Sequence, residues 1–128
     1  MNPNELARER YVNLATFKRS GAEAKTPIWF ASDPQDPRRL WMYTNGKSWK
    51  VKRIRNDARA RVAACDARGK VHGPWLDAGA RIASDERAIA RAIDLLLAKY
   101  GWQARLLLLG ARVANTWKDR TVLEVTLA

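Results

Sequence analysis

Three side chains near the middle of the sequence have the types and the spacing to bind a phosphate group. Thr44 and Ser48 supply hydroxyl groups, and Lys50 supplies an ammonium group shortly after Ser48. The turn-forming residues 45–47 come before Ser48, so Ser48 can cap a short helix, residues 49–57. A helix start carries unpaired N–H groups and a partial positive charge, which attract phosphate. We therefore predict charge-assisted hydrogen bonds from these side chains to one phosphate.

A run of basic residues surrounds this predicted phosphate site. Between Lys47 and Arg61 only Asp57 opposes the positive charge. The basic residues are Lys47, Lys50, Lys52, Arg53, Arg55, Arg59 and Arg61. The chain has a net charge of +11, which favours a polyanionic partner: nucleic acid, an acidic membrane surface or a phosphorylated small molecule. An ordinary solvated helix face would look the same, and the glycine-rich loops of the common nucleotide-binding proteins are absent.

Few residues suggest any other kind of chemistry. Cys65 is the only cysteine and His72 the only histidine, so we expect neither a disulfide nor a multi-cysteine metal site. No metal site and no catalytic side chain are predicted. Most of the tryptophans are expected to be packing residues, with Trp41 and Trp102 in the core.

Apolar periodicity and turn signals predict the elements that position these residues. The expected strands are residues 11–17, 24–31, 39–44, 59–66, 75–83 and 121–127. The expected helices are residues 49–57, 87–100 and 102–114, and residues 33–37 are expected to form a loop. Hairpin-linked strands with helices inserted late predict a mainly β, α+β fold: an antiparallel barrel of about six strands with peripheral helices.

The length of 128 residues leaves room for one domain, which we expect to span residues 1–128. No apolar run reaches the roughly 20 residues that a membrane span needs. The polar first residues do not look like a signal peptide, so a cytoplasmic location is expected. Pro27 lies inside a predicted strand, which should therefore be at a sheet edge, at a bulge or against a ligand.

The segment around the predicted phosphate site resembles that of a known family. The motif Tyr43-Thr44-Asn45-x-x-Ser48-x-Lys50, followed by Ile54, Asn56 and Arg59, resembles the flavin-phosphate segment of the pyridoxamine 5′-phosphate oxidase superfamily. Further segments resemble a short subgroup of deazaflavin-dependent relatives. They are Tyr11-Val12-Asn13-Leu14-Ala15-Thr16, Lys25-Thr26-Pro27, Lys50-Val51-Lys52-Arg53-Ile54-Arg55 and Cys65-Asp66-x-Arg68-Gly69. The resemblance covers most of residues 11–127.

This resemblance implies a split β-barrel of Greek-key-like topology and a homodimer with two cofactor sites at its interface. The implied cofactor is FMN or the deazaflavin coenzyme of the F420 type. Lys25, Thr26, Pro27 and Ile28 would contact the ring, partly through their backbone. Tyr43 and Thr44 would lie by the ribityl chain and the phosphate, while Ser48 and Lys50 would hold the phosphate. Trp49 is a further candidate for the cofactor site, and Trp29, Trp49 and Trp75 could flank the ring or its substrate.

Two departures from the family pattern limit what the resemblance implies. Trp49 stands where the oxidase proper usually has an arginine, so one phosphate ligand is missing. Lys47 or Lys52 could compensate for it. The sequence also lacks the Arg-x-His segment with which the true oxidase binds its pyridoxal substrate. We therefore do not expect vitamin B6 oxidation.

The resemblance implies an oxidoreductase that transfers hydride between the bound cofactor and a small organic substrate. The cofactor would supply the hydride chemistry, and the protein would supply position and electrostatics. One alternative is a non-catalytic carrier or sensor of the same cofactor. Another is a nucleic-acid-binding protein, suggested by the net charge and the tryptophans, although no nucleic-acid-binding fold signature is present.

Overall fold

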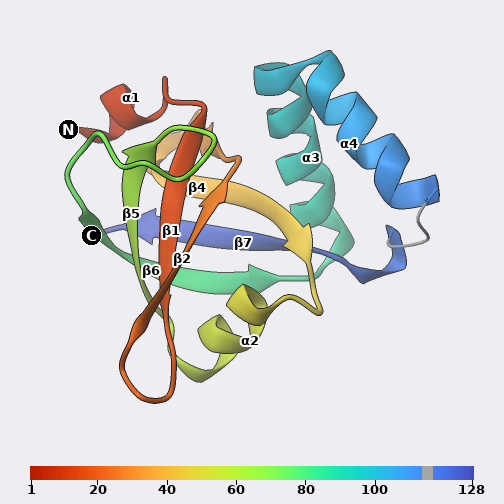
Figure 1. Ribbon diagram of the computed structural model, residues 1–128. Helices are drawn as coiled ribbons and strands as arrows, with labels where there is room; N and C mark the ends of the chain where they lie inside the picture. The colour runs from red at the N-terminus through yellow and green to blue at the C-terminus, as the bar shows by residue number, and fades with distance from the viewer. Residues whose placement is uncertain (114–116) are drawn as a thin grey trace.

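The computed structural model describes residues 1–113 and 117–128, in which seven antiparallel strands form one sheet (Figure 1). The order of the strands across the sheet is β2-β1-β5-β6-β7-β4-β3. The strands are β1 Tyr11–Phe17, β2 Glu23–Ile28, β3 Ala31–Asp33, β4 Asp36–Asn45, β5 Arg59–Cys65, β6 Leu76–Ala83 and β7 Arg120–Leu127. The predicted α+β class with an antiparallel sheet and peripheral helices is confirmed.

Helices lie around the sheet and are mostly where the sequence places them. They are α1 Pro3–Leu6, α2 Trp49–Asn56, α3 Glu86–Tyr100 and α4 Trp102–Val113, and a short 3-10 helix, η1, spans Trp117–Asp119. The last predicted helix ran to Ala114, which lies outside the described residues. Within the described part of the chain, no helix is both long and apolar enough to cross a membrane.

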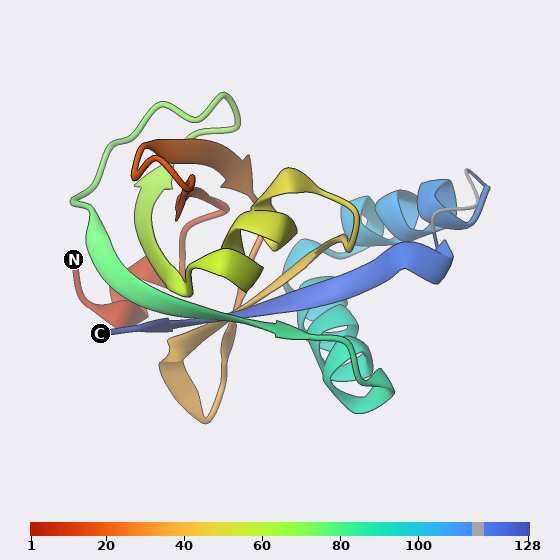
Figure 2. The same cartoon turned by 90° about the horizontal axis from the view of Figure 1, so that it is seen from below.

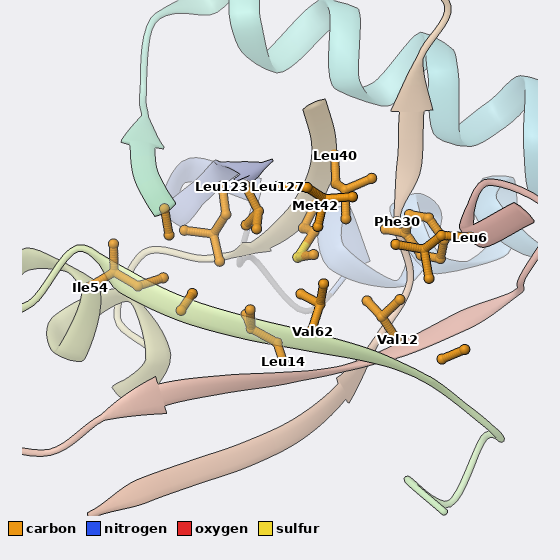
Figure 3. Packing of buried hydrophobic residues seen from close by; sticks show 14 of the residues in the cluster. Leu6, Val12, Leu14, Phe30, Leu40, Met42, Ile54, Val62, Leu123 and Leu127 are labelled. Carbon is orange, nitrogen blue, oxygen red and sulfur yellow. The ribbon is translucent and has the colours of Figure 1, made fainter. Parts of the chain in front are cut away.

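The sheet curls around one core, and this curl gives it the shape of a half-barrel (Figure 2). Side chains from β1, β4, β5 and β7 meet inside the curl, among them Leu14, Met42 and Leu123. Helix α2 adds Val51 and Ile54 to the same cluster. Figure 3 shows Ile54 at the edge of this packed group. The helix start that follows Ser48 is therefore fixed by the burial of the opposite face of α2.

The other face of β4 and β7 carries α3 and α4. Trp41 and Val122 pack there against Ile89 of α3, so the predicted burial of Trp41 is confirmed. Tyr43, on the same face of β4, packs against a second cluster that includes Leu96 of α3. Since side chains alternate along a strand, each face of β4 supports a different helical element.

The prediction of about six strands is corrected to seven. The predicted loop at residues 33–37 is instead a tight hairpin, in which Asp33 pairs with Asp36 and the strand register shifts between Ser32 and Asp33. A carboxylate oxygen of Asp33 accepts the Gln35 N–H at 2.9 Å, which closes the turn. A strand of three residues is too short to show a periodic pattern, so β3 left no signal in the sequence.

Pro27 lies in β2, at one edge of the sheet. Of the three predicted settings for this strand, the edge position is therefore the one observed, and an edge position tolerates the missing N–H of a proline. Strand β2 ends at Ile28 rather than at residue 31, and Trp29 and Phe30 lead directly into β3.

Candidate functional site

The turn before α2 is tightly organised by Asn45. Its side-chain oxygen accepts the Lys47 N–H at 2.8 Å, and its carbonyl oxygen accepts the Ser48 N–H at 3.0 Å. The Gly46 N–H donates to the carbonyl oxygen of Asp119 at 2.7 Å. A Cβ at Gly46 would lie 3.2 Å from that same oxygen, so a larger residue would push the turn away from Asp119. The predicted turn is thus fixed both locally and by the segment before β7.

Ser48 occupies the N-cap position of α2, with the extended backbone that this position requires (φ −69°, ψ 156°). Its side chain makes no capping hydrogen bond. The hydroxyl oxygen is buried and has no hydrogen-bond partner among the described residues. An unsatisfied buried hydroxyl costs roughly 1–3 kcal/mol, a cost that a ligand oxygen at this position would remove. The position of Ser48 as predicted is confirmed, whereas its predicted hydrogen bond to the helix start is not made.

Lys50 lies in the first turn of α2 and is half-buried. Burial lowers its pKa, and the neighbouring positive charge of Arg53 lowers it further. Within the described residues, Lys50 makes no ion pair. A buried cation without a carboxylate partner is stabilised by an anionic ligand, which would also raise its pKa again. Ser48 and Lys50 together therefore fit a phosphate group.

The two lysines that could compensate for the missing arginine lie in different surroundings. Lys47 is exposed and its ammonium group lies 3.7 Å from a carboxylate oxygen of Asp119. The Lys52 ammonium lies 4.5 Å from the centre of the Trp49 ring, in a cation–π contact. Trp49 itself is 70% exposed.

Tyr43 and Thr44 point to opposite faces of β4, but both line a cavity of about 570 Å³ at the end of that strand. Thr44 is buried and pairs with Thr121 of β7. Burial raises the pKa of the half-buried Tyr43, although the charge of Arg120 opposes the shift. The cavity is lined by Tyr43, Thr44, Asn45, Leu106, Leu107, Gly110, Ala111 and Arg120.

The helical side of this cavity was not predicted from the sequence. Leu106, Leu107 and Gly110 come from α4, which the sequence predicted as a helix without assigning it any part in the site. The available signal for the cavity was Gly110, which lies among leucines in the predicted helix. A glycine has no side chain and so leaves space next to β4. Arg120, at the start of β7, was missed because no motif contains it.

The residues predicted to contact the cofactor ring lie on β2, far from β4 in the order of strands. Lys25 and Pro27 are exposed, whereas Thr26 and Ile28 are half-buried and Ile28 packs against the core. The Lys25 ammonium lies 5.2 Å from the centre of the Trp75 ring. The structure thus places the predicted residues on three elements: β2, the end of β4 and the start of α2.

The predicted core position of Trp102 is wrong. Its side chain is 69% exposed at the start of α4. The helix buries Ala104 instead and turns Trp102 outward. The apolar character of a residue does not by itself tell which face of a helix is buried.

A family model described as pyridoxamine 5′-phosphate oxidase matches residues 4–128. The chain belongs to this family. The resemblance seen in the sequence is therefore confirmed, and it extends to nearly the whole chain. Members of the pyridoxamine 5′-phosphate oxidase family include oxidoreductases. No curated protein sequence matches the chain at a significant level.

Solved structures of the same fold carry different functions in their names. HutZ, the heme storage protein from Vibrio cholerae, matches with a TM-score of 0.70 and 10% identity, over 98% of this chain and 87% of its own. An F420 reductase matches with a TM-score of 0.62 and 18% identity, over 96% and 90%. An FAD-binding protein from Mesorhizobium loti matches with a TM-score of 0.66 and 17% identity, over 96% and 84%. At these identities the likeness shows the fold alone.

Proposed function

We propose that this member of the pyridoxamine 5′-phosphate oxidase family binds the phosphate of FMN or of the F420-type deazaflavin coenzyme at the start of α2, and acts as an oxidoreductase. The observation that supports it most is the buried Ser48 hydroxyl, close in sequence to the half-buried ammonium of Lys50. Neither the hydroxyl nor the ammonium has a partner among the residues that the structure describes. The F420 reductase and the FAD-binding protein of the same fold agree with a flavin-type cofactor.

Each predicted residue has a defined part in this proposal. Ser48 and Lys50 bind the phosphate oxygens, helped by the free N–H groups of the first turn of α2. Thr44 and Tyr43 border the ribityl chain from the end of β4. Lys25–Ile28 of the edge strand β2 lie along the ring. Trp49 and Lys52, on the outward face of α2, flank the phosphate.

The bound cofactor would accept or donate hydride at its ring, and the protein would hold ring and substrate next to each other. Pro27 has no backbone N–H to donate along the edge of β2. The flat ring would therefore pack against this position instead of accepting a hydrogen bond from it. The partly apolar cavity beside Tyr43 and Thr44 offers room for a small organic substrate.

We further propose that the protein is a homodimer with one cofactor between the subunits at each of two sites. Residues predicted to bind one cofactor lie on β2 and β4, which are separated by four strands in the sheet order. A second subunit would enclose the ring from the side that β2 leaves exposed. Helix α4 also presents apolar side chains to solvent, as an interface requires.

The test is a titration of the purified protein with FMN and with the deazaflavin coenzyme, together with mass spectrometry of any cofactor that it retains. Lys50→Ala should weaken binding by at least about tenfold, because a charge-assisted hydrogen bond is worth roughly 1.5–3 kcal/mol. Ser48→Ala should weaken it less. Lys70→Ala removes an equal charge from an exposed turn and serves as the control. Binding of neither cofactor, or equal binding by Lys50→Ala, would refute the proposal.

A non-catalytic cofactor carrier is the second candidate, and the shared fold of a heme storage protein favours it. This candidate predicts the same cofactor affinity and the same effect of Lys50→Ala. The two differ in turnover. An oxidoreductase should oxidise the reduced cofactor faster than buffer does when quinones, enones or nitro compounds are added as acceptors, whereas a carrier should not.

A further inference from the structure

A basic groove of about 720 Å³ runs between the outward face of α2 and the turn that joins β1 to β2. Both elements lie at the lower end of the molecule in Figure 1. The groove is lined by Phe17, Lys18, Arg19, Trp49, Lys52, Arg53, Arg55 and Asn56. Its size is within the range of cavities that bind small molecules.

The spacing of the α2 residues explains why they share this groove. Trp49, Lys52, Arg53 and Asn56 follow at i, i+3, i+4 and i+7, so they lie on one face of the helix. That face is opposite Val51 and Ile54, whose burial fixes the rotation of the helix. The burial of Val51 and Ile54 in the core therefore fixes the helix face that lines the groove.

The other wall is equally ordered. The turn after β1 is closed by two backbone hydrogen bonds, from Lys18 N–H to the carbonyl oxygen of Ala22 and from Gly21 N–H to that of Lys18, both at 2.9 Å. Gly21 has a φ of 89°, which the turn requires and a side chain would strain. Lys18 and Arg19 thus reach the groove from a defined backbone.

No carboxylate among the described residues balances the charge of the groove. Its cations are Lys18, Arg19, Lys52, Arg53 and Arg55, and none of its lining residues carries a carboxylate. Within the described residues, none of these cations makes an ion pair. Carboxylates elsewhere already bind other arginines, as Asp33 does with Arg91 at 2.9 Å. Unpaired cations gathered around one groove point to an anionic ligand with several charges.

One of these cations is also fixed in direction. The Arg53 Nε donates to the hydroxyl oxygen of Thr16 at 2.7 Å, and Thr16 is buried. This hydrogen bond uses one edge of the guanidinium group and leaves its terminal nitrogens for another partner. Arg53 can therefore bind a phosphate without first losing side-chain entropy.

Two aromatic rings give the groove an apolar wall. The Trp49 ring is 70% exposed, with Lys52 above it. Phe17 is half-buried, and the guanidinium group of Arg59 lies 4.8 Å from the centre of its ring. Arg59 is held there by Asp57 at 2.7 Å. An exposed tryptophan beside unpaired cations suits a ligand that combines a planar ring with phosphate groups.

We propose that the basic groove binds a planar aromatic ring that carries two or more negative charges, as a nucleoside diphosphate does. The ring would stack on Trp49, and the phosphates would bind Arg19, Arg53 and Arg55. A ligand of this chemistry can be a separate nucleotide or the nucleotide half of a dinucleotide cofactor. The inference does not depend on a flavin at the start of α2.

The test is isothermal titration calorimetry with ADP, with Trp49 fluorescence as a second readout. Wild-type protein should bind ADP, and the double variant Arg19→Glu/Arg55→Glu should bind it at least about tenfold more weakly, since each lost charge-assisted contact costs roughly 1.5–3 kcal/mol. The control is Arg8→Glu/Arg87→Glu, which changes two exposed arginines elsewhere and alters the net charge equally. It should bind within about twofold of wild type.

The proposal would be overturned by no binding of ADP, by equal loss in the control variant, or by pyrophosphate binding as tightly as ADP. The last would mean that the ring contributes nothing. Trp49→Ala should weaken ADP binding, while Trp49→Phe should largely preserve it. A single-stranded oligonucleotide that binds far more tightly than ADP would also overturn it, in favour of nucleic acid.

Two further arms identify the source of the ligand. If ADP binds to FMN-saturated protein but not to FAD-saturated protein, the groove binds the nucleotide half of a dinucleotide cofactor. ADP that binds both shows a separate nucleotide site. ADP binding by a protein that takes up neither flavin supports the basic groove and refutes only the proposed oxidoreductase.

Discussion

A buried acid shows how single residues hold this sheet together. Asp33 is 2% exposed and lies at the end of the short strand β3. Its carboxylate oxygens accept hydrogen bonds from Arg91 at 2.9 Å, from Trp41 Nε1 at 3.1 Å and from the Gln35 N–H at 2.9 Å. The acid therefore links the β3–β4 hairpin to α3.

The pKa of Asp33 predicts a loss of stability in acid. Burial raises this pKa, but the hydrogen bonds from Arg91, Gln35 and Trp41 together outweigh burial and lower it to about 2. Since this is below the value of about 3.9 expected in the unfolded chain, the stabilisation is complete above pH 4. It should be lost as the pH falls from about 4 to about 2, with a cost on the order of 2 kcal/mol.

Thermal unfolding between pH 2 and pH 7 measures this effect. Asp33→Asn should unfold at a lower temperature at pH 7 and should depend less on pH in the acid range. Asp94→Asn, at an exposed position of α3, is the control. Equal acid sensitivity of wild type and Asp33→Asn would contradict the prediction.

At this scale the sequence located Ser48 and Lys50 at the start of α2 better than it located the other residues near the candidate site. Ser48 and Lys50 stand in a motif whose spacing is fixed by one helical turn, so local sequence contained the information. The approach of Lys18 and Arg19 to α2 could not be predicted in this way, because it is a tertiary contact. The unpartnered state of the Ser48 hydroxyl was equally invisible, since it depends on what surrounds the atom in space.

Among the elements, α3 is tied to the strands by Tyr100. Its ring stacks on Trp29, with centres 4.4 Å apart and planes at 4°. The hydroxyl accepts the Phe30 N–H at 3.1 Å and lies 2.7 Å from the carbonyl oxygen of Arg10, to which it donates. Burial raises the pKa of Tyr100 to about 12. Its hydroxyl is therefore a neutral donor at all ordinary pH values.

Removal of this hydroxyl should loosen the junction between β2 and β3. Tyr100→Phe leaves the buried Phe30 N–H without its partner, so the free energy of unfolding should fall by roughly 1–3 kcal/mol. Urea unfolding followed by circular dichroism measures it. Tyr11→Phe is the matched control, because Tyr11 is half-buried and its hydroxyl makes no hydrogen bond within the described residues. A similar loss in both variants would mean that the hydroxyl is not the cause.

The elements themselves were largely predictable from periodicity. Helix α2 was predicted to within one residue, since Val51 and Ile54 mark its buried face and a turn precedes it. Strand β3 was missed because it is short, and the end of β2 was placed too late because Trp29 and Phe30 continue the apolar pattern. The order of the strands was not predicted, as hairpin signals do not specify which distant strands pair.

On the scale of the whole molecule, α4 has an apolar stripe that stays exposed among the residues that the structure describes. Trp102, Leu106, Leu109 and Val113 follow at i, i+4, i+7 and i+11 and therefore lie on one side of the helix. They are 69%, 58%, 57% and 81% exposed. Contiguous exposed apolar side chains are typical of protein interfaces.

We expect this stripe to contribute to the proposed homodimer. Leu106→Asp/Leu109→Asp should convert dimers to monomers, because two charges in an apolar interface would be desolvated without partners. Sedimentation velocity at several protein concentrations measures the change. Ala90→Asp/Ala98→Asp, on exposed positions of α3, adds the same charge as a control. A wild-type protein that is monomeric at all concentrations would refute the dimer, and a dimeric double variant would place the interface elsewhere.

The position of β7 determines when the sheet of this protein can be completed. It is the last strand in the chain, yet it lies between β6 and β4 and joins two parts of the sheet that otherwise share no ladder. Gly46, before α2, also donates its N–H to Asp119 just ahead of β7. During synthesis on the ribosome, the edges of β6 and β4 therefore stay unpaired until β7 has been made. Unpaired strand edges are prone to aggregate. The turn before α2 reaches its final form only after Asp119 and the residues of β7 have emerged.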